Sequence, residues 1–360
     1  MTTDETIRAA GTRKYLGLQI LRITAACMVL LTHATLFASE RLDSHFGIWR
    51  QGAVGVELFF VLSGFVMVYS SIKLMNDSNG WKIFAERRIV RIVPIYWIAT
   101  SFKVLALVLT SGYVLHARFS VVRTLESYLF LPAFNDEGGI GPVLSVGWTL
   151  NFEMFFYFLF ALALLFRADV YKFVGGVLAL LGIGSFFRQA SWPAASFYLS
   201  PLVLEFFYGM VIAKLCLAGK HIPKYFAMPL LGLGFLDLLV PWSLPSPVGQ
   251  LHHGIAAALI VYSMASLEDF MSRIPRFVLY MADASYAIYL FHPLIAPAAP
   301  AVLMRLHLIY PWLSVACSAA LGLGGGCLVH FVIEAPMTRW FRDHLLIGGK
   351  KVIHPVATVG

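Results

Sequence analysis

Residues 16–38 read LGLQILRITAACMVLLTHATLFA, an apolar stretch interrupted by only two ionisable side chains, Arg22 and His33. A helix needs about 20 mainly apolar residues to cross the hydrocarbon core of a bilayer. The stretch therefore predicts a membrane-spanning helix. Arg8, Arg13 and Lys14 precede it, and its length favours an uncleaved first span over a signal peptide.

The composition of the whole chain agrees with this interpretation. Of its 360 residues, 59% are hydrophobic and only 13% are charged. The mean hydropathy is +0.78. Soluble domains carry roughly 25% charged residues, so this chain has too few polar side chains to cover a water-facing surface. A soluble fold is excluded.

Comparable apolar stretches recur along the chain. We predict an all-α fold, a polytopic integral membrane bundle of about ten transmembrane helices. Residues 16–345 form its single membrane domain, between a cytoplasmic N-terminal tail at 1–15 and a cytoplasmic C-terminal tail at 346–360. The ninth span, rich in proline, is expected to kink or break. The expected spans are 16–38, 53–73, 92–112, 146–166, 173–188, 200–218, 225–241, 252–268, 277–301 and 311–333.

The net charge of +8 is attributed to basic residues in the loops between spans, where they set the orientation of the chain in the membrane. No nucleic-acid partner is predicted. When loops are assigned alternately to the two sides, one side holds 19 Lys and Arg and the other holds six. The positive-inside rule then places both termini in the cytoplasm, which requires an even number of spans. Residues 80–97, GWKIFAERRIVRIVPIYW, read as an amphipathic helix on the inner face of the bilayer, leading through Pro94 into the third span.

Ionisable residues inside the spans indicate a site, because such groups are costly in a bilayer and usually line a pathway. Arg22 and His33 are 11 positions apart, so they share one face of a helix and lie about 16 Å apart along its axis. Glu57 and Glu153 are expected at the depth of His33, in the outer half, and His292 can also reach this level. A histidine beside a carboxylate is the usual arrangement of a general base.

Alternatives remain at each position. An intramembrane histidine can simply join two helices by a hydrogen bond, and Glu57 is near enough to a span end to reach interfacial water. His252 and His253 are expected to face the outer solvent. The four cysteines show no metal-ligand spacing, so no metal is predicted. The remaining acidic residues of the spans read as structural or interfacial: Glu205, Asp237, Asp283 and Glu334.

Arg87, Arg88 and Arg91 form a cationic group on neighbouring turns of one helix. Such a group binds anionic lipid headgroups and sets topology. It also suits a phosphate-rich ligand in the cytoplasm, because guanidinium forks match phosphate oxygens. The spacing leaves both interpretations open.

Several of these motifs, in this order, resemble the acyltransferase type 3 family of membrane proteins, and within it the exopolysaccharide O-acetyltransferases. The resemblance covers nearly the whole chain. It rests on Arg22 with His33, on Arg88 and Arg91 before Pro94, and on four longer segments: GVELFFVLSGF at 55–65, VGWTLNFEMFFY at 146–157, SYAIYLFHP at 285–293, and the terminal EAPMTRWFR. One departure is Glu57, where many relatives have aspartate.

The resemblance implies an enzyme of the bacterial cytoplasmic (inner) membrane that takes acetyl from acetyl-CoA and delivers it to a glycan acceptor on the outer face. His33 and Glu153 would be catalytic. Supporting positions would be Glu57, Trp148, Tyr157 and His292. The acyl-CoA would be bound by Arg22, Ser63, Arg87, Arg88 and Arg91.

Two other functions fit the same residues. A transporter or flippase for a lipid-linked sugar would use the buried charges as a polar pathway, although the chain shows no internal repeat of the kind found in many transporters. A non-catalytic scaffold of a polysaccharide assembly complex would tolerate apolar residues in place of Arg22 and His33. The acceptor glycan and the oligomeric state stay open.

Overall fold

The computed structural model describes residues 15–109, 119–135, 138–189, 191–242, 244–271 and 274–344. Every regular element in these ranges is a helix, and the only β-type pairing there is an isolated bridge between Phe134 and Ile140. The predicted all-α class is confirmed.

Eight helices of the described ranges are long and apolar enough to cross a membrane. The chain is therefore a multi-pass membrane protein. These helices are α2 (Leu16–Arg41), α3 (Gly55–Ser71) after the short helix η1 (Arg50–Val54), α4 (Gly80–Leu109), α6 (Trp148–Leu165), α7 (Val170–Gly184), α8 (Val203–Leu217), α12 (Ser285–Ile295) joined to α13 (Ala298–Arg305), and α14 (Pro311–Val329).

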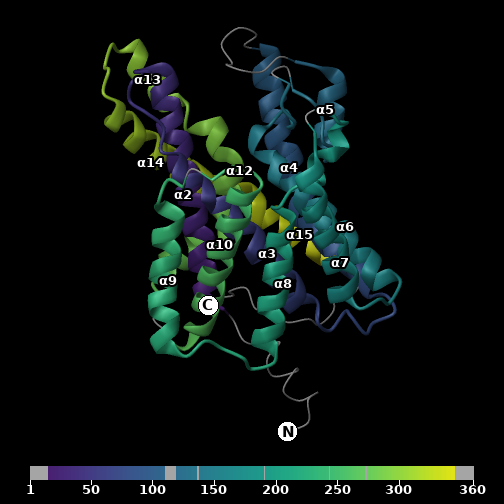
Figure 1. Cartoon of the computed structure of the whole chain (residues 1–360). Coiled ribbons are helices and arrows are strands. Elements are labelled where there is room, and N and C mark those ends of the chain that lie inside the picture. The colour runs from purple at the N-terminus through teal and green to yellow at the C-terminus, as the bar shows by residue number, and fades with distance from the viewer. Residues whose placement is uncertain are drawn as a thin grey trace.

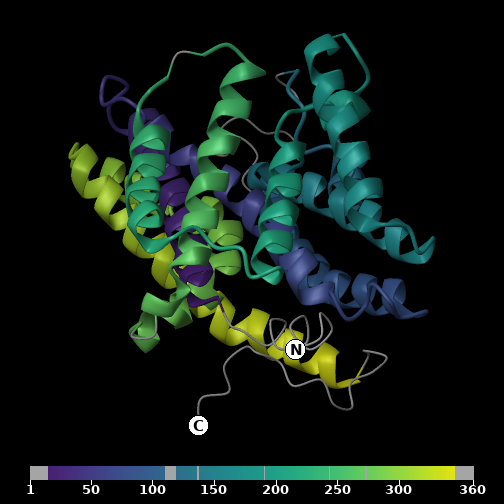
Figure 2. The ribbon, with the colours of Figure 1, turned by 60° about the horizontal axis from the view of Figure 1, so that its bottom comes forward.

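The other two predicted spans correspond to α9 (Lys224–Leu239) and α10 (Val248–Ser266), which do not meet that criterion of length and apolarity. Helix α9 has 16 residues, a length of about 24 Å. Helix α10 carries Gln250, His252 and His253 in its first two turns. These two helices pack against each other at one flank of the bundle, while α6 and α7 lie at the opposite flank (Figures 1 and 2). The count of ten stays a prediction.

Proline has different effects in two of the predicted spans. The amphipathic segment and the third span form one continuous helix, α4, with Pro94 inside it. Proline is tolerated within membrane helices because neighbouring groups satisfy the freed carbonyl. The ninth span does break: α12 ends at Ile295 and α13 begins at Ala298, after Pro297. A separate short helix, α11 (Arg276–Asp283), precedes α12.

The beginning of α2, the first described helix, and the end of α15, the last described helix, lie on the same side of the bundle. Glu268, in the turn after α10, accepts hydrogen bonds from the backbone N–H of Leu16 (2.5 Å) and of Gly17 (3.0 Å), at the start of α2. Helix α14 continues through a π-helical turn, η6 (His330–Glu334), into α15 (Ala335–His344), which contacts α4. An even number of crossings fits this arrangement.

Helices α3 and α8 approach each other backbone to backbone at two glycines. A Cβ atom at Gly64 would clash with the carbonyl oxygen of Phe206, and one at Gly209 would clash with the carbonyl oxygen of Val61. Gly55 approaches the backbone of α2 at Ala25 in the same way. Small residues at membrane helix interfaces allow such close approach. Gly55 and Gly64 therefore serve helix packing and leave no passage for a ligand.

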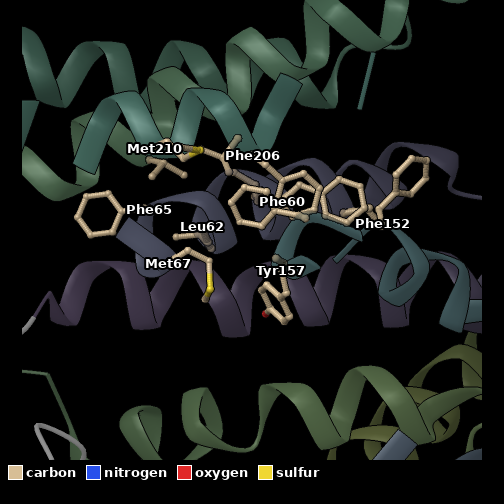
Figure 3. Close-up of a cluster of buried hydrophobic side chains, with 14 of the residues drawn as sticks. Phe60, Leu62, Phe65, Met67, Phe152, Tyr157, Phe206 and Met210 are labelled. Carbon is tan, nitrogen blue, oxygen red and sulfur yellow. The ribbon is translucent and has the colours of Figure 1, made fainter. Parts of the chain in front are cut away.

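Around this crossing, aromatic rings from three helices stack in one buried cluster (Figure 3). Phe206 of α8 lies between Phe60 of α3 and Phe156 of α6, with ring centroids 4.6 Å away in both cases. Offset aromatic pairs add stability beyond the area they bury. The cluster fixes α3, α6 and α8, which carry the polar groups described below.

Replacing Gly64 with alanine is expected to destabilise the protein by about 1–3 kcal/mol, because the added methyl group forces α3 and α8 apart. Gly176 of α7 is the matched control, since a Cβ there meets no atom within 4 Å. Gly176→Ala should leave stability unchanged or raise it. Thermal unfolding of both variants in detergent measures the difference, and equal melting temperatures would contradict the packing argument.

Candidate functional site

Two histidines from distant parts of the sequence meet in the half of the bundle that the predicted orientation places outside. His33 lies on α2 and His292 on α12, and the Nδ1 of His33 is 3.2 Å from the Nε2 of His292. Each ring also contacts the carbonyl four residues earlier on its own helix. The His33 Nδ1 lies 2.9 Å from the oxygen of Val29, and the His292 Nδ1 lies 3.2 Å from the oxygen of Ile288.

These contacts determine where the ring protons lie. The carbonyl of Ile288 can only accept, so the Nδ1 of His292 carries a proton and donates it. The Nε2 of a neutral His292 then accepts, and the hydrogen between the rings belongs to the Nδ1 of His33. We infer that the Nε2 of His33 has no proton and, among the described residues, no partner. Its lone pair is available as a base.

His33 opens onto a cavity of about 320 Å³, here called the outer cavity. The cavity lies where α2, α3, α6, α10 and α12 come together. Polar, aromatic and aliphatic groups share its wall. The lining residues are Val29, Thr32, His33, Ala53, Val56, Glu57, Ser145, Val146, Trp148, Leu202, Gln250 and Tyr289.

The loop before α6 supplies part of this wall and is held in place. Ser127, at the end of α5 (Val121–Tyr128), accepts a hydrogen bond from the N–H of Val143 (2.9 Å), and its carbonyl accepts one from Tyr96 (3.1 Å). Tyr289 of α12 donates to the carbonyl of Val146 (3.1 Å). The wall at Ser145 and Val146 is therefore anchored to α4 and α12.

Glu57 reaches the outer cavity and contacts a histidine behind it. Its Oε1 is 4.0 Å from the Nδ1 of His253 on α10. The neighbouring His252 pairs with Asp237 of α9 at 3.2 Å. Both rings lie toward carboxylates of adjacent helices, yet their side chains stay 31% and 24% exposed, so the expectation that His252 and His253 face outer solvent stays a prediction.

Glu153 does not pair with His33, contrary to expectation. It accepts hydrogen bonds from Ser63 (3.1 Å) and from Tyr157. The reason is depth. Ser63 lies six residues beyond Glu57 on α3, about 9 Å deeper along the helix. Glu153 therefore sits below the outer cavity, while Trp148, five residues earlier on α6, lines it.

Glu153 belongs to a chain of contacts that continues toward the inner end of the bundle. The guanidinium of Arg88 donates to the hydroxyl of Ser70 (2.8 Å) and lies over the ring of Tyr157, 5.8 Å from its centroid. Tyr157 in turn bonds Glu153. Figure 3 shows the Tyr157 hydroxyl turned away from the aromatic row. We call Ser63, Ser70, Arg88, Glu153 and Tyr157 the inner polar network.

Three further arginines surround this network. Arg88 is within electrostatic range of Arg87 and Arg91, and Arg91 is within range of Arg22. Arg22 is within electrostatic range of three carboxyl groups, Asp283, Glu334 and Glu153, and Arg88 is within range of Glu153. In the described part of the chain none of the four arginines forms an ion pair. Positive charges gathered without ion pairs form a site suited to an anion. We call them the arginine cluster.

Some cavity residues were not anticipated from the sequence. The residues Gln250, Tyr289 and Ser145 line the cavity but carry no charge. Only ionisable side chains stand out within an apolar stretch, so the sequence did not single these residues out. Tyr289 does lie three residues before His292, in a segment that the sequence singled out. Of the anticipated residues, His33, Glu57 and Trp148 line the outer cavity, and His292 lies behind His33 and contacts its ring.

Replacing His292 with phenylalanine is expected to lower kcat about tenfold, because one hydrogen bond that holds the His33 ring is lost while that to Val29 remains. The KM values for both substrates should not change, since His292 does not line the cavity. Steady-state kinetics on the purified variant measure kcat and the two KM values separately. A wild-type kcat, or a raised KM with an unchanged kcat, would contradict a positioning role.

Comparison with known proteins gives two kinds of match. A family model described as an acyltransferase domain matches residues 15–343. The chain is 33% identical over 325 residues to the exopolysaccharide production protein ExoZ of Rhizobium meliloti (strain 1021), covering 87% of this chain and 96% of that protein. It is 27% identical over 320 residues to nodulation protein 10 of Rhizobium leguminosarum bv. viciae, covering 77% and 81%. No solved structure matches the chain significantly.

Proposed function

This chain belongs to the acyltransferase family, and from that premise we propose that it is an O-acetyltransferase of the bacterial inner membrane. It would move an acetyl group from cytoplasmic acetyl-CoA to a hydroxyl of an exported polysaccharide or its lipid-linked precursor. The name of the relative from Rhizobium meliloti, an exopolysaccharide production protein, supports the acceptor class. Both termini would lie in the cytoplasm, as the positive-inside rule predicts.

The observation that carries this proposal is the free Nε2 of His33 at the outer cavity. In the direct route, this nitrogen removes the proton of the acceptor hydroxyl, and the oxygen attacks the carbonyl carbon of the thioester. The carbon–sulfur bond breaks, and the proton on His33 passes to the leaving thiolate, giving free CoA and the acetyl ester. His292 holds the His33 ring for this transfer.

A second route uses His33 as a transient acyl carrier. The Nε2 attacks the thioester first, the carbon–sulfur bond breaks, and CoA leaves as a thiolate that takes a proton from solvent. The acceptor hydroxyl then takes the acetyl group from the ring. The hydroxyl proton returns to solvent in that case. The geometry at Nε2 serves both routes equally.

The donor would enter from the inner end. Its phosphates suit the arginine cluster, because guanidinium groups bind phosphate oxygens in pairs. Its arm would follow the inner polar network toward the outer cavity, along the side of α2 that carries both Arg22 and His33. Within this proposal Glu153 acts on the donor side, balancing the arginines and ordering Tyr157 and Ser63.

Mass spectrometry of the surface polysaccharide, from strains with and without the gene, tests the function. Loss of the gene should remove acetyl groups and leave the polymer length and amount unchanged. A transporter would instead be required for the polymer itself. Loss of the polymer would therefore contradict the proposal, as would an unchanged acetyl content.

A further inference from the structure

The wall of the outer cavity has more hydrogen-bonding capacity than the protein itself uses. Among the described residues, no protein group bonds the indole N–H of Trp148, the amide of Gln250 or the hydroxyl of Ser145. The Oε2 of Glu57 has no partner either. The residues Trp148, Gln250, Ser145 and Glu57 thus bring donors and acceptors to the wall of one small space, next to the base His33. Ligand pockets are mostly apolar with a few polar groups that fix orientation, and this wall fits that description.

Trp148 presents a rigid aromatic surface in this wall. Its ring meets the rings of Phe60, Phe152 and Phe197 edge on, at centroid distances of 6.1, 6.0 and 6.5 Å. A ring held by three neighbours loses little further entropy when a ligand packs on it. The combination of an aromatic surface, a carboxylate and an amide suits a ligand with an apolar C–H face and a rim of hydroxyl groups.

The same wall offers no cationic side chain of the Lys or Arg type to an anion. No Lys or Arg occurs among the twelve residues that line the outer cavity. Behind Glu57 lies a second carboxyl group, Glu205 of α8, which is 1% exposed and within electrostatic range of Glu57. Neither carboxyl oxygen of Glu205 has a hydrogen-bond partner among the described residues. The basic ring on this side, His253, already faces Glu57.

We propose that the outer cavity selects an uncharged sugar unit, whose neighbouring hydroxyls bond Glu57 and Gln250 while its ring packs on Trp148, and that it rejects anionic sugars. A sugar carboxylate in this cavity would lose its hydration and gain no cation. It would also lie beside the carboxyl group of Glu57, which adds no positive charge to the cavity wall. This inference rests on the proposed function and adds the chemical class of the acceptor.

The test compares two small acceptors that differ only in charge, methyl β-D-glucopyranoside and methyl β-D-glucopyranosiduronate. The full chain is purified in detergent and supplied with radiolabelled acetyl-CoA. We expect the kcat/KM of the neutral glycoside to exceed that of the uronate by about tenfold or more. Equal values would overturn the inference.

Two variants and a control identify the residues responsible. Glu57→Ala removes one hydrogen-bonding group from the wall, so it should raise the KM for the neutral glycoside about tenfold and shrink the neutral-to-uronate ratio. Gln250→Ala should raise the KM for the neutral glycoside about tenfold, without changing kcat or the KM for acetyl-CoA. His252→Ala, on the same helix but outside the cavity, should change none of these values. Wild-type ratios and KM values in both variants would overturn the inference.

The two levels of the proposal fail in different ways. If the wild-type protein acetylates neither glycoside and the surface polysaccharide also lacks gene-dependent acetyl groups, the proposed function is wrong. If the polysaccharide is acetylated in a gene-dependent manner but neither glycoside is used, only the inference about the cavity is wrong.

Discussion

Replacing His33 with alanine is expected to lower acetyl transfer by about 10²–10⁴-fold, because the substitution removes the only unprotonated ring nitrogen that faces the outer cavity among the described residues. The protein should still insert and fold, since the ring is only partly buried and the cavity already exists beside it. Acetyl content of the polysaccharide, and initial rates with purified protein, measure the effect. Transfer at more than a tenth of the wild-type rate would remove His33 from the mechanism.

A matched control is His45→Ala, which removes an exposed imidazole from the loop after α2 and should leave the rate unchanged. Incubation of the wild-type protein with labelled acetyl-CoA, without an acceptor, separates the two routes. Label on His33, absent from the alanine variant, indicates the acyl carrier. Full transfer activity with no labelled protein indicates the direct route.

Replacing Arg88 with alanine is expected to raise the KM for acetyl-CoA by about 10–100-fold, the loss that follows when one charge-assisted hydrogen bond to phosphate is removed. Lysine should not restore the wild-type value. The guanidinium plane lies over the rings of Phe84 and Tyr157 while it bonds Ser70, and an ammonium group cannot do both. Arg91→Gln should act in the same direction.

Lys82→Ala is the control for charge alone, since Lys82 is an exposed residue on the same helix. It should leave the KM for acetyl-CoA unchanged. The alternative meaning of the arginine cluster, contact with anionic lipid headgroups, makes a different prediction: Arg88→Ala would then change membrane insertion or lipid dependence and leave the KM at its wild-type value.

The sequence predicted the helical spans well because the evidence for them is local. Length and apolarity of each stretch are enough, and the break near Pro297 follows from a missing N–H and a fixed φ. The helix continues through Pro94, as the sequence led us to expect, because a membrane helix can keep its course through a proline when its neighbours satisfy the backbone. The number of crossings depends on α9 and α10, whose apolar stretches are short or interrupted by polar residues.

The partners in the site were harder to predict, because they depend on how far each antiparallel helix is shifted along the bundle. A shift of two turns moves Glu153 from the level of His33 to the level of Ser63. Hydropathy does not report such shifts. The sequence identified His292 as a residue able to reach the level of His33. That His292 contacts His33, and Glu153 does not, follows only from the way α12 packs against α2. Gln250 gave no signal because an amide costs little near a span end.

Within the proposed function, one part of the acceptor wall lies on a helix that carries none of the donor-binding groups. The arginine cluster lies on α2 and α4, whereas Gln250 and His253 lie on α10, which packs with α9 at one flank of the bundle. Duplicated genes could therefore diverge in the glycan that their products acetylate through substitutions in the α9–α10 hairpin. The residues proposed to bind acetyl-CoA would stay unchanged. A bacterial lineage could in this way alter its surface antigens by a few substitutions in one hairpin.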